Sequence, residues 1–159
     1  MYMEKTTWAP QMVPTFWINH ASRLIMRQFE DELRPLGFGF AYVPVVRALE
    51  ESGPLIQKDL VALAHVEQPT MTALLARMER DHIIRRVADP ADGRANRISL
   101  TAEAKKKLPR VRAALQVVVE RALAGLEPDG QQALMDLLQR VVQNLNQRSK
   151  TGPSDARLK

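Results

Sequence analysis

The sequence predicts a mainly α-helical protein that carries one small β-hairpin, and three observations support this fold class. Apolar residues recur at helical spacing over most of residues 13–148. Within that range two short helices are separated by only three residues, 65–67, which is typical of a helix-turn-helix. Two short strand-like segments then flank a turn that contains Pro90, Gly93 and Asn96. Because this hairpin directly follows the helix-turn-helix, we expect a winged helix-turn-helix domain.

The apolar spacing predicts helices over residues 13–34, 41–51, 55–64, 68–81, 101–124 and 128–148. Pro35 should end the first helix and Gly53 the second. Pro44 is tolerated in the first turn of the second helix, whereas Pro109 is expected to kink the fifth. Thr101 is a suitable N-cap for that fifth helix.

These elements predict one intertwined domain with two functional parts. Residues 41–100 are expected to form the winged helix-turn-helix lobe. The long helices within 13–36 and 101–148 are too long and too apolar to serve that lobe alone, so we expect them to form a homodimer. A two-fold dimer would match a pseudo-palindromic site on double-stranded DNA. Residues 1–12 are expected to form an N-terminal arm and residues 149–159 a disordered tail.

The composition limits the class of protein. The chain has 159 residues and a net charge of +5, which weakly favours nucleic acid as a partner. Basic and acidic residues are nearly balanced within residues 55–101, so particular arginines, and not the total charge, must carry that interpretation. The absence of cysteine excludes disulfides and thiolate metal ligands. No apolar run approaches ~20 residues and no signal peptide is evident, which predicts a cytoplasmic protein without membrane association.

Three segments, at residues 68–72, 75–79 and 89–101, carry a family resemblance. The last contains an Asp-x-Arg pair and then an apolar-x-Leu-Thr ending, at positions 92, 94, 98, 100 and 101. With these motifs, residues 13–148 resemble the MarR family of bacterial winged-helix transcriptional regulators. The resemblance implies a triangular homodimer that holds two wings over DNA. It also implies a repressor that releases DNA when a small aromatic or phenolic anion binds between its lobes.

Eight residues are candidates for DNA contact, four at the start of the reading helix and four in the hairpin: Gln68, Pro69, Thr70, Thr72, Arg85, Arg86, Arg94 and Arg97. In the major groove Gln can pair with adenine, and Thr can meet a base edge or a thymine methyl group. We expect Arg94 to enter the narrow, negative minor groove and the other three arginines to hold phosphates. The alternative is that the first four residues only begin a helix and that Arg94 is a solvated hairpin side chain.

Asp92 is an unusual residue for a turn that faces DNA, because its carboxylate repels phosphate. The resemblance suggests that it orients Arg77 or Arg94, so we interpret Asp92 and Arg77 as a structural brace of the wing. The alternative is that Asp92 only forms the turn. We interpret the three lysines at 105–107 as a solvated helix face in preference to a phosphate contact.

A possible effector site is suggested by aromatic and basic residues near the N-terminus. Trp17, His20 and Arg23 share one helical face, and Tyr42 begins the second helix. An aromatic lining with a His or Arg to receive a carboxylate would suit a small aromatic acid. The alternative is that these residues belong to the dimer core.

Three positions depart from the family pattern. His65 and His82 stand at two helix ends where relatives often have Gly, and both corners are candidates for a positive φ. Ala73 stands where relatives often place a larger polar or basic residue, which puts one base contact in doubt.

The sequence argues against catalysis. Its three histidines have no partner at metal-ligand spacing, and neither a phosphate-binding Gly-rich loop nor a Gly-x-Ser-x-Gly motif is present. We therefore expect no catalytic residues, no metal and no cofactor beyond the possible aromatic acid effector. The alternative to a DNA-binding regulator is a dimeric ligand-binding or protein-interaction module that does not bind an operator.

Overall fold

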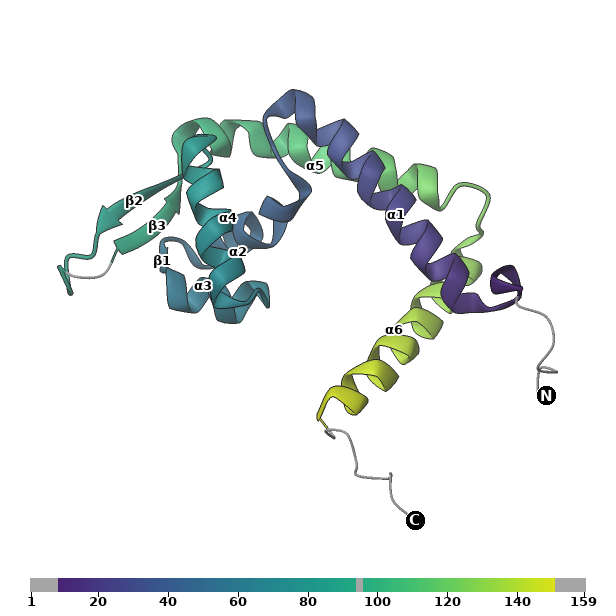
Figure 1. Cartoon of the computed structure of the whole chain (residues 1–159). Helices are drawn as coiled ribbons and strands as arrows, with labels where there is room; N and C mark the ends of the chain where they lie inside the picture. The colour runs from purple at the N-terminus through teal and green to yellow at the C-terminus, as the bar shows by residue number, and fades with distance from the viewer. Residues whose placement is uncertain (1–8, 94–95, 151–159) are drawn as a thin grey trace, which may run out of the picture. The chain divides into compact units, whose positions relative to one another are not determined.

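The structure is a computed structural model of the chain, and it describes residues 9–93 and 96–150. Its elements follow the order predicted from the sequence (Figure 1). The 3-10 helices are η1 (Pro10–Met12), η2 (Arg34–Leu36) and η3 (Phe40–Tyr42). The α-helices are α1 (Pro14–Leu33), α2 (Val43–Ser52), α3 (Gln57–Ala64), α4 (Gln68–Arg80), α5 (Ala102–Ala122) and α6 (Pro128–Lys150). The strands are β1 (Leu55–Ile56), β2 (Ile84–Ala88) and β3 (Asn96–Leu100). The predicted fold class, mainly α with a β-hairpin wing, is confirmed.

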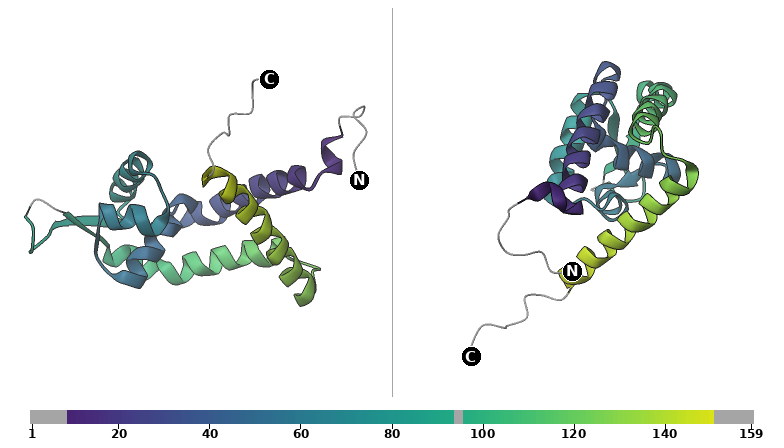
Figure 2. Two further views of the ribbon diagram at one scale, coloured as in Figure 1. Left: turned by 90° about the horizontal axis from the view of Figure 1, so that it is seen from below. Right: turned by 90° about the vertical axis from the view of Figure 1, so that its right-hand side faces the viewer.

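The chain divides into two compact units, Met1–Val119 and Glu120–Lys159. The first contains the helix-turn-helix, made of α3 and α4, and the hairpin of β2 and β3. The hairpin projects from the helices around it (Figure 2). The second unit contains α6, which continues two residues past the predicted end at 148.

The sheet has one strand more than the sequence predicted. Leu55 and Ile56, expected to begin a helix, form β1 and pair antiparallel with Ile98 and Arg97. The strand order is therefore β1-β3-β2. Gly53 has a φ of 74°, and the turn it makes with the following proline prevents α3 from starting before Gln57. The extended segment then satisfies the open hydrogen-bonding edge of β3.

The core of the first unit lies under α4. All four residues of the predicted apolar stripe of that helix are buried: Met71, Leu74, Leu75 and Met78. The stripe packs against residues of α1, α2, α3 and the sheet that are also buried, including Leu33, Val45, Leu60, Ile84 and Ile98. With this face anchored, the opposite face of α4 is left on the surface.

Two histidines hold the left-handed backbone conformation that the sequence suggested. His65 ends α3 with a φ of 53°, and His82 follows α4 with a φ of 58°. The second corner is fixed by Thr101, whose hydroxyl donates a hydrogen bond to the His82 carbonyl at 2.7 Å. The same oxygen accepts the N–H of Ala104 at 3.0 Å, which confirms Thr101 as the N-cap of α5. α5 then runs through Pro109 without a break.

Candidate nucleic-acid interface

The exposed face of α4 starts at its first turn. Pro69 occupies an early helix position where its missing N–H costs no hydrogen bond. Gln68, Pro69, Thr70 and Thr72 are all exposed, whereas Met71 between them is fully buried. The helix period thus separates one anchoring side chain from four side chains that can meet a ligand. These four are the residues that the sequence predicted for the major groove.

A hydrogen-bonded chain links α3 to α4 at this face. The Thr72 hydroxyl donates to the Gln68 carbonyl at 3.0 Å and accepts the side-chain amide N–H of Gln57 at 2.8 Å. Gln57 is the first residue of α3 and was not among the sequence-predicted site residues. Only the tertiary structure brings it to the reading helix, because it lies 15 residues earlier in the chain.

The wing arginines are held by neighbouring side chains. Arg86 forms an ion pair with Glu79 at 3.1 Å, and Arg97 forms one with Asp89 at 3.1 Å. Arg85 donates a hydrogen bond to the Ser99 hydroxyl on the facing strand at 3.3 Å. Arg94, the predicted minor-groove residue, lies outside the described residues.

Asp89 is a structural residue of the wing that the sequence interpretation missed. Its side chain is buried, and one carboxylate oxygen accepts the backbone N–H of Ala91 at 2.9 Å while the other faces Arg97. The hydrogen bond from Ala91, together with Arg97, lowers the pKa of Asp89. An Asp two residues before the N–H that it binds is an Asx-turn, so the sequence did contain a local signal.

The sequence suggested that Asp92 orients Arg77 or Arg94 as a brace of the wing. Asp92 and Arg77 are both exposed, and Arg94 lies outside the described residues, so this brace stays a prediction. A hydrogen bond joins the C-terminal end of α4 to Tyr42 of η3. The buried Tyr42 hydroxyl donates a hydrogen bond to Asp81 at 2.5 Å. Burial, reinforced by this hydrogen bond and by the charge of Asp81, raises the pKa of Tyr42 to about 12.

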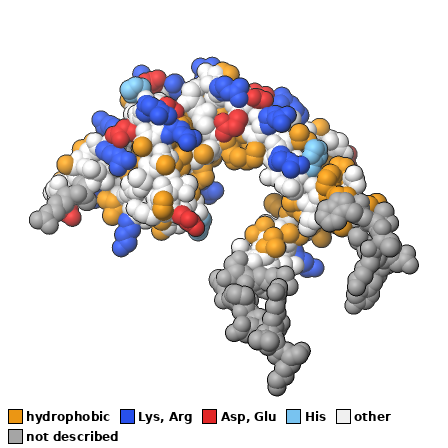
Figure 3. All heavy atoms as spheres, in the orientation of Figure 1, with side chains coloured by type: hydrophobic (Ala, Val, Ile, Leu, Met, Phe, Trp, Pro, Cys, Tyr) orange, Lys and Arg blue, Asp and Glu red, His pale blue; other side chains and the backbone are white. Residues whose placement is uncertain are grey.

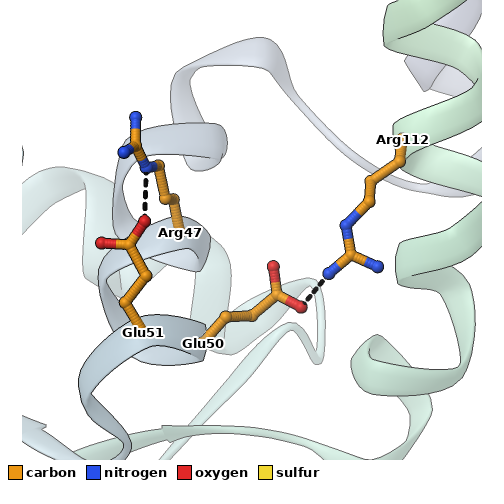
Figure 4. Close-up of polar contacts among 4 residues, drawn as sticks. All are labelled: Arg47, Glu50, Glu51 and Arg112. Carbon is orange, nitrogen blue, oxygen red and sulfur yellow. Dashed lines mark hydrogen bonds and ion pairs between the residues drawn. The ribbon is translucent and has the colours of Figure 1, made fainter.

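Two cavities lie between α2 and α5 within the first unit. One of about 170 Å³ has a largely apolar lining: Phe38, Val43, Val46, Leu108, Val111 and Leu115, with Arg47, Glu50 and Arg112. The other, of about 420 Å³, shares Glu50 and Arg112 and adds Lys105. Glu50 and Arg112 form an ion pair that joins α2 to α5, and Arg47 pairs with Glu51 beside it (Figure 4).

The comparisons with known proteins decide the family. A model described as the MarR family matches residues 43–95, which run from α2 into the wing. The homoprotocatechuate degradative operon repressor of Escherichia coli is 31% identical over 111 residues, which are 70% of this chain and 75% of that protein. This chain belongs to the MarR family.

Solved structures agree with that assignment. A probable transcriptional regulator from Pseudomonas aeruginosa is 28% identical, with a TM-score of 0.72 over 84% of this chain and 99% of that chain. BpsR of Bordetella bronchiseptica, whose DNA binding is regulated by 6-hydroxynicotinic acid, is 18% identical and shares the fold. Its TM-score is 0.72 over 86% of this chain and 97% of that chain. The MarR-family protein described here is therefore a DNA-binding transcriptional regulator and not an enzyme, as the sequence predicted.

Of the residues predicted to bind an effector in this MarR-family structure, Trp17 and His20 lie against each other on α1, with ring centroids 6.3 Å apart. Trp17 is 55% exposed on α1, where its indole N–H donates to the Gln11 carbonyl at 2.9 Å. His20 stacks on Phe16 with ring centroids 6.1 Å apart, and Arg23 is exposed. Tyr42 is turned to Asp81. None of these four lines the smaller cavity between α2 and α5, which sequence patterns did not reveal.

The described residues contain neither a metal-binding cluster nor a helix that could cross a membrane. Among residues 9–93 and 96–150, no three His, Asp or Glu side chains are grouped to hold a metal ion. No helix in that part of the MarR-family chain combines the length and hydropathy that a membrane span requires.

Proposed function

We propose that this regulator is a cytoplasmic repressor that reads a pseudo-palindromic operator as a homodimer, with α4 in the major groove and the wing on the minor groove. The observation that carries the proposal is the division of α4 into a buried stripe and an exposed first turn of Gln68, Pro69, Thr70 and Thr72. A helix anchored in this way can present its N-terminal side chains to base edges. The name of the Escherichia coli relative supports repression.

In this proposal the wing arginines contact two different parts of the DNA. Arg85, Arg86 and Arg97 hold phosphates, and Arg94 enters the minor groove. Charge is mixed over the face shown in Figure 3, where acidic side chains lie between basic ones. A general basic surface is therefore a weaker explanation of DNA binding than individually placed arginines. The ion pairs of Arg86 and Arg97 keep these side chains ordered before DNA arrives.

The second copy of the chain would cover apolar surface on α1 and α6. In α6, Leu137 and Leu145 are each 63% exposed and Val142 is 56% exposed. Hydrophobic side chains reach the surface along this helix (Figure 3), and a groove of about 690 Å³ runs along it within the second unit. Trp17, Leu24 and Met26 are exposed apolar residues of α1. Large apolar side chains exposed along each of these helices are uncommon on a monomer, which supports the expectation that residues 13–36 and 101–148 dimerise.

For the effector we propose a single-ring aromatic carboxylate in the smaller cavity between α2 and α5. The apolar lining suits a ring, and Arg112 suits a carboxylate. To bind Arg112 fully, the ligand must displace Glu50, which would remove the ion pair that joins α2 of the DNA-binding lobe to α5. Lys105, which lines the neighbouring cavity with Glu50, is placed to receive the released carboxylate. The residues predicted from the sequence to bind the effector, Trp17, His20, Arg23 and Tyr42, remain a second candidate site.

A gel-shift titration tests the DNA-binding proposal. The probes are a duplex that the wild-type protein selects from a randomised library and a scrambled duplex of the same length. Arg94→Ala should weaken binding by about 1–3 kcal/mol for each half-site, because it removes a charge-assisted contact and a register anchor. Arg110→Ala, an exposed arginine on α5, is the matched control and should bind normally. Failure of the wild-type protein to select any duplex would favour the alternative, a dimeric module without an operator.

A further inference from the structure

The hydrogen bonds at the start of α4 restrict what Thr72 can do. A hydroxyl group has one hydrogen to donate, and Thr72 donates it to the Gln68 carbonyl at 3.0 Å. The same oxygen accepts the Gln57 amide N–H at 2.8 Å. The Thr72 side chain is nevertheless exposed on the face of α4 that is proposed to meet DNA.

With its only hydrogen engaged, the Thr72 hydroxyl can offer DNA just one acceptor lone pair, and the methyl group is the other part of the side chain that can make a contact. Ala73, the next residue, is also exposed and ends in a methyl group. In the major groove the only apolar feature of a base edge is the C5-methyl group of thymine. The methyl groups of Thr72 and Ala73 are suited to contact a thymine methyl group, and they cannot recognise a base by hydrogen bonds.

We propose that Thr72 reads a thymine C5-methyl group and that Gln57 is a positioning residue for this contact. The inference rests on the proposed entry of α4 into the major groove. Gln57 acts through Thr72, because its amide holds the hydroxyl against α4 and so keeps the methyl group directed outward. It belongs to α3 and is half-buried, which limits the movement of its own side chain. The first helix of the motif thereby contributes to base preference.

The test replaces single thymines by deoxyuridine, which lacks only the methyl group, in the duplex that the wild-type protein selects. One thymine in each half-site should show a loss of affinity of about fourfold when replaced, the value expected for one buried methyl group. Thr72→Val keeps the methyl group without the hydroxyl and should retain this sensitivity. Thr72→Ser keeps the hydroxyl without the methyl group and should lose it. The opposite order of Val and Ser would overturn the inference, because it would mean that the Thr72 oxygen makes the contact.

A double-mutant cycle tests the role of Gln57. Gln57→Ala alone should weaken discrimination between thymine and deoxyuridine about twofold or more, whereas in the Thr72→Val background it should change nothing, since no hydroxyl remains to be held. An equal effect in both backgrounds would show that Gln57 contacts DNA directly and would refute its positioning role. Circular dichroism of each variant confirms folding. Selection of no duplex by the wild-type protein would refute the proposed function itself, whereas a selected duplex insensitive to every deoxyuridine would refute only this inference.

Discussion

The ion pair between Glu50 and Arg112 sets a free-energy cost that a carboxylate must meet before it can bind Arg112 in the proposed effector site. The Arg112 side chain is 61% exposed and that of Glu50 is 32% exposed, so the pair is partly screened by solvent. Exposed ion pairs contribute about 0.2–1 kcal/mol, which is the free energy that an incoming carboxylate must replace at Arg112. Glu50→Gln removes the competing charge while keeping the size of the side chain. The affinity for benzoate should then rise by a factor of about 1.4 to 5.

Calorimetric titration of benzoate and of neutral benzamide measures this effect. The affinity for benzamide should be the same in wild type and Glu50→Gln, because benzamide does not compete as an anion. Glu103→Gln is the matched control, since it breaks the ion pair with Lys107 on α5, and neither residue lines the smaller cavity. It should leave the affinity for benzoate near the wild-type value. Equal benzoate affinities for Glu50→Gln and wild type, or an equal gain in Glu103→Gln, would refute the displacement of Glu50.

Three further predictions concern the dimer, the wing and the end of α4. Leu137→Asp places a charge on the apolar face of α6 and should abolish dimerisation and DNA binding together, so analytical ultracentrifugation should find an 18.0 kDa species. Arg86→Ala should weaken binding to selected and scrambled duplexes alike and flatten the salt dependence by about one unit, whereas a changed base preference would contradict its role as a phosphate contact. Tyr42→Phe should lower the free energy of unfolding by about 1 kcal/mol through loss of the hydrogen bond to Asp81. Because the pKa of Tyr42 is raised to about 12, its contribution is complete below pH 10 and is lost as the pH rises from 10 to 12, so urea titrations of wild type and Tyr42→Phe should converge there.

Most of the fold could be predicted because its signals are local. The apolar stripe of α4, the turn residues of the hairpin and the cap at Thr101 are each determined by residues close together in the chain. The left-handed corners at His65 and His82 were also indicated by their position at helix ends. The extra strand β1 was missed, because two residues are too few to show a period and their pairing partner lies more than 40 residues later.

The sequence by itself determined the family, the winged helix-turn-helix and the residues at the start of the reading helix. The tertiary structure decided which side chains meet: Gln57 with Thr72, Asp89 with Arg97, and Glu50 with Arg112. It also turned Tyr42 toward Asp81 and opened a cavity between α2 and α5 that has a different lining from the predicted effector residues. The physical reason is one of range. Helix period, caps and turns depend on neighbours within a few residues, whereas a cavity or an ion pair between helices depends on how whole faces pack, which no short segment of the sequence contains.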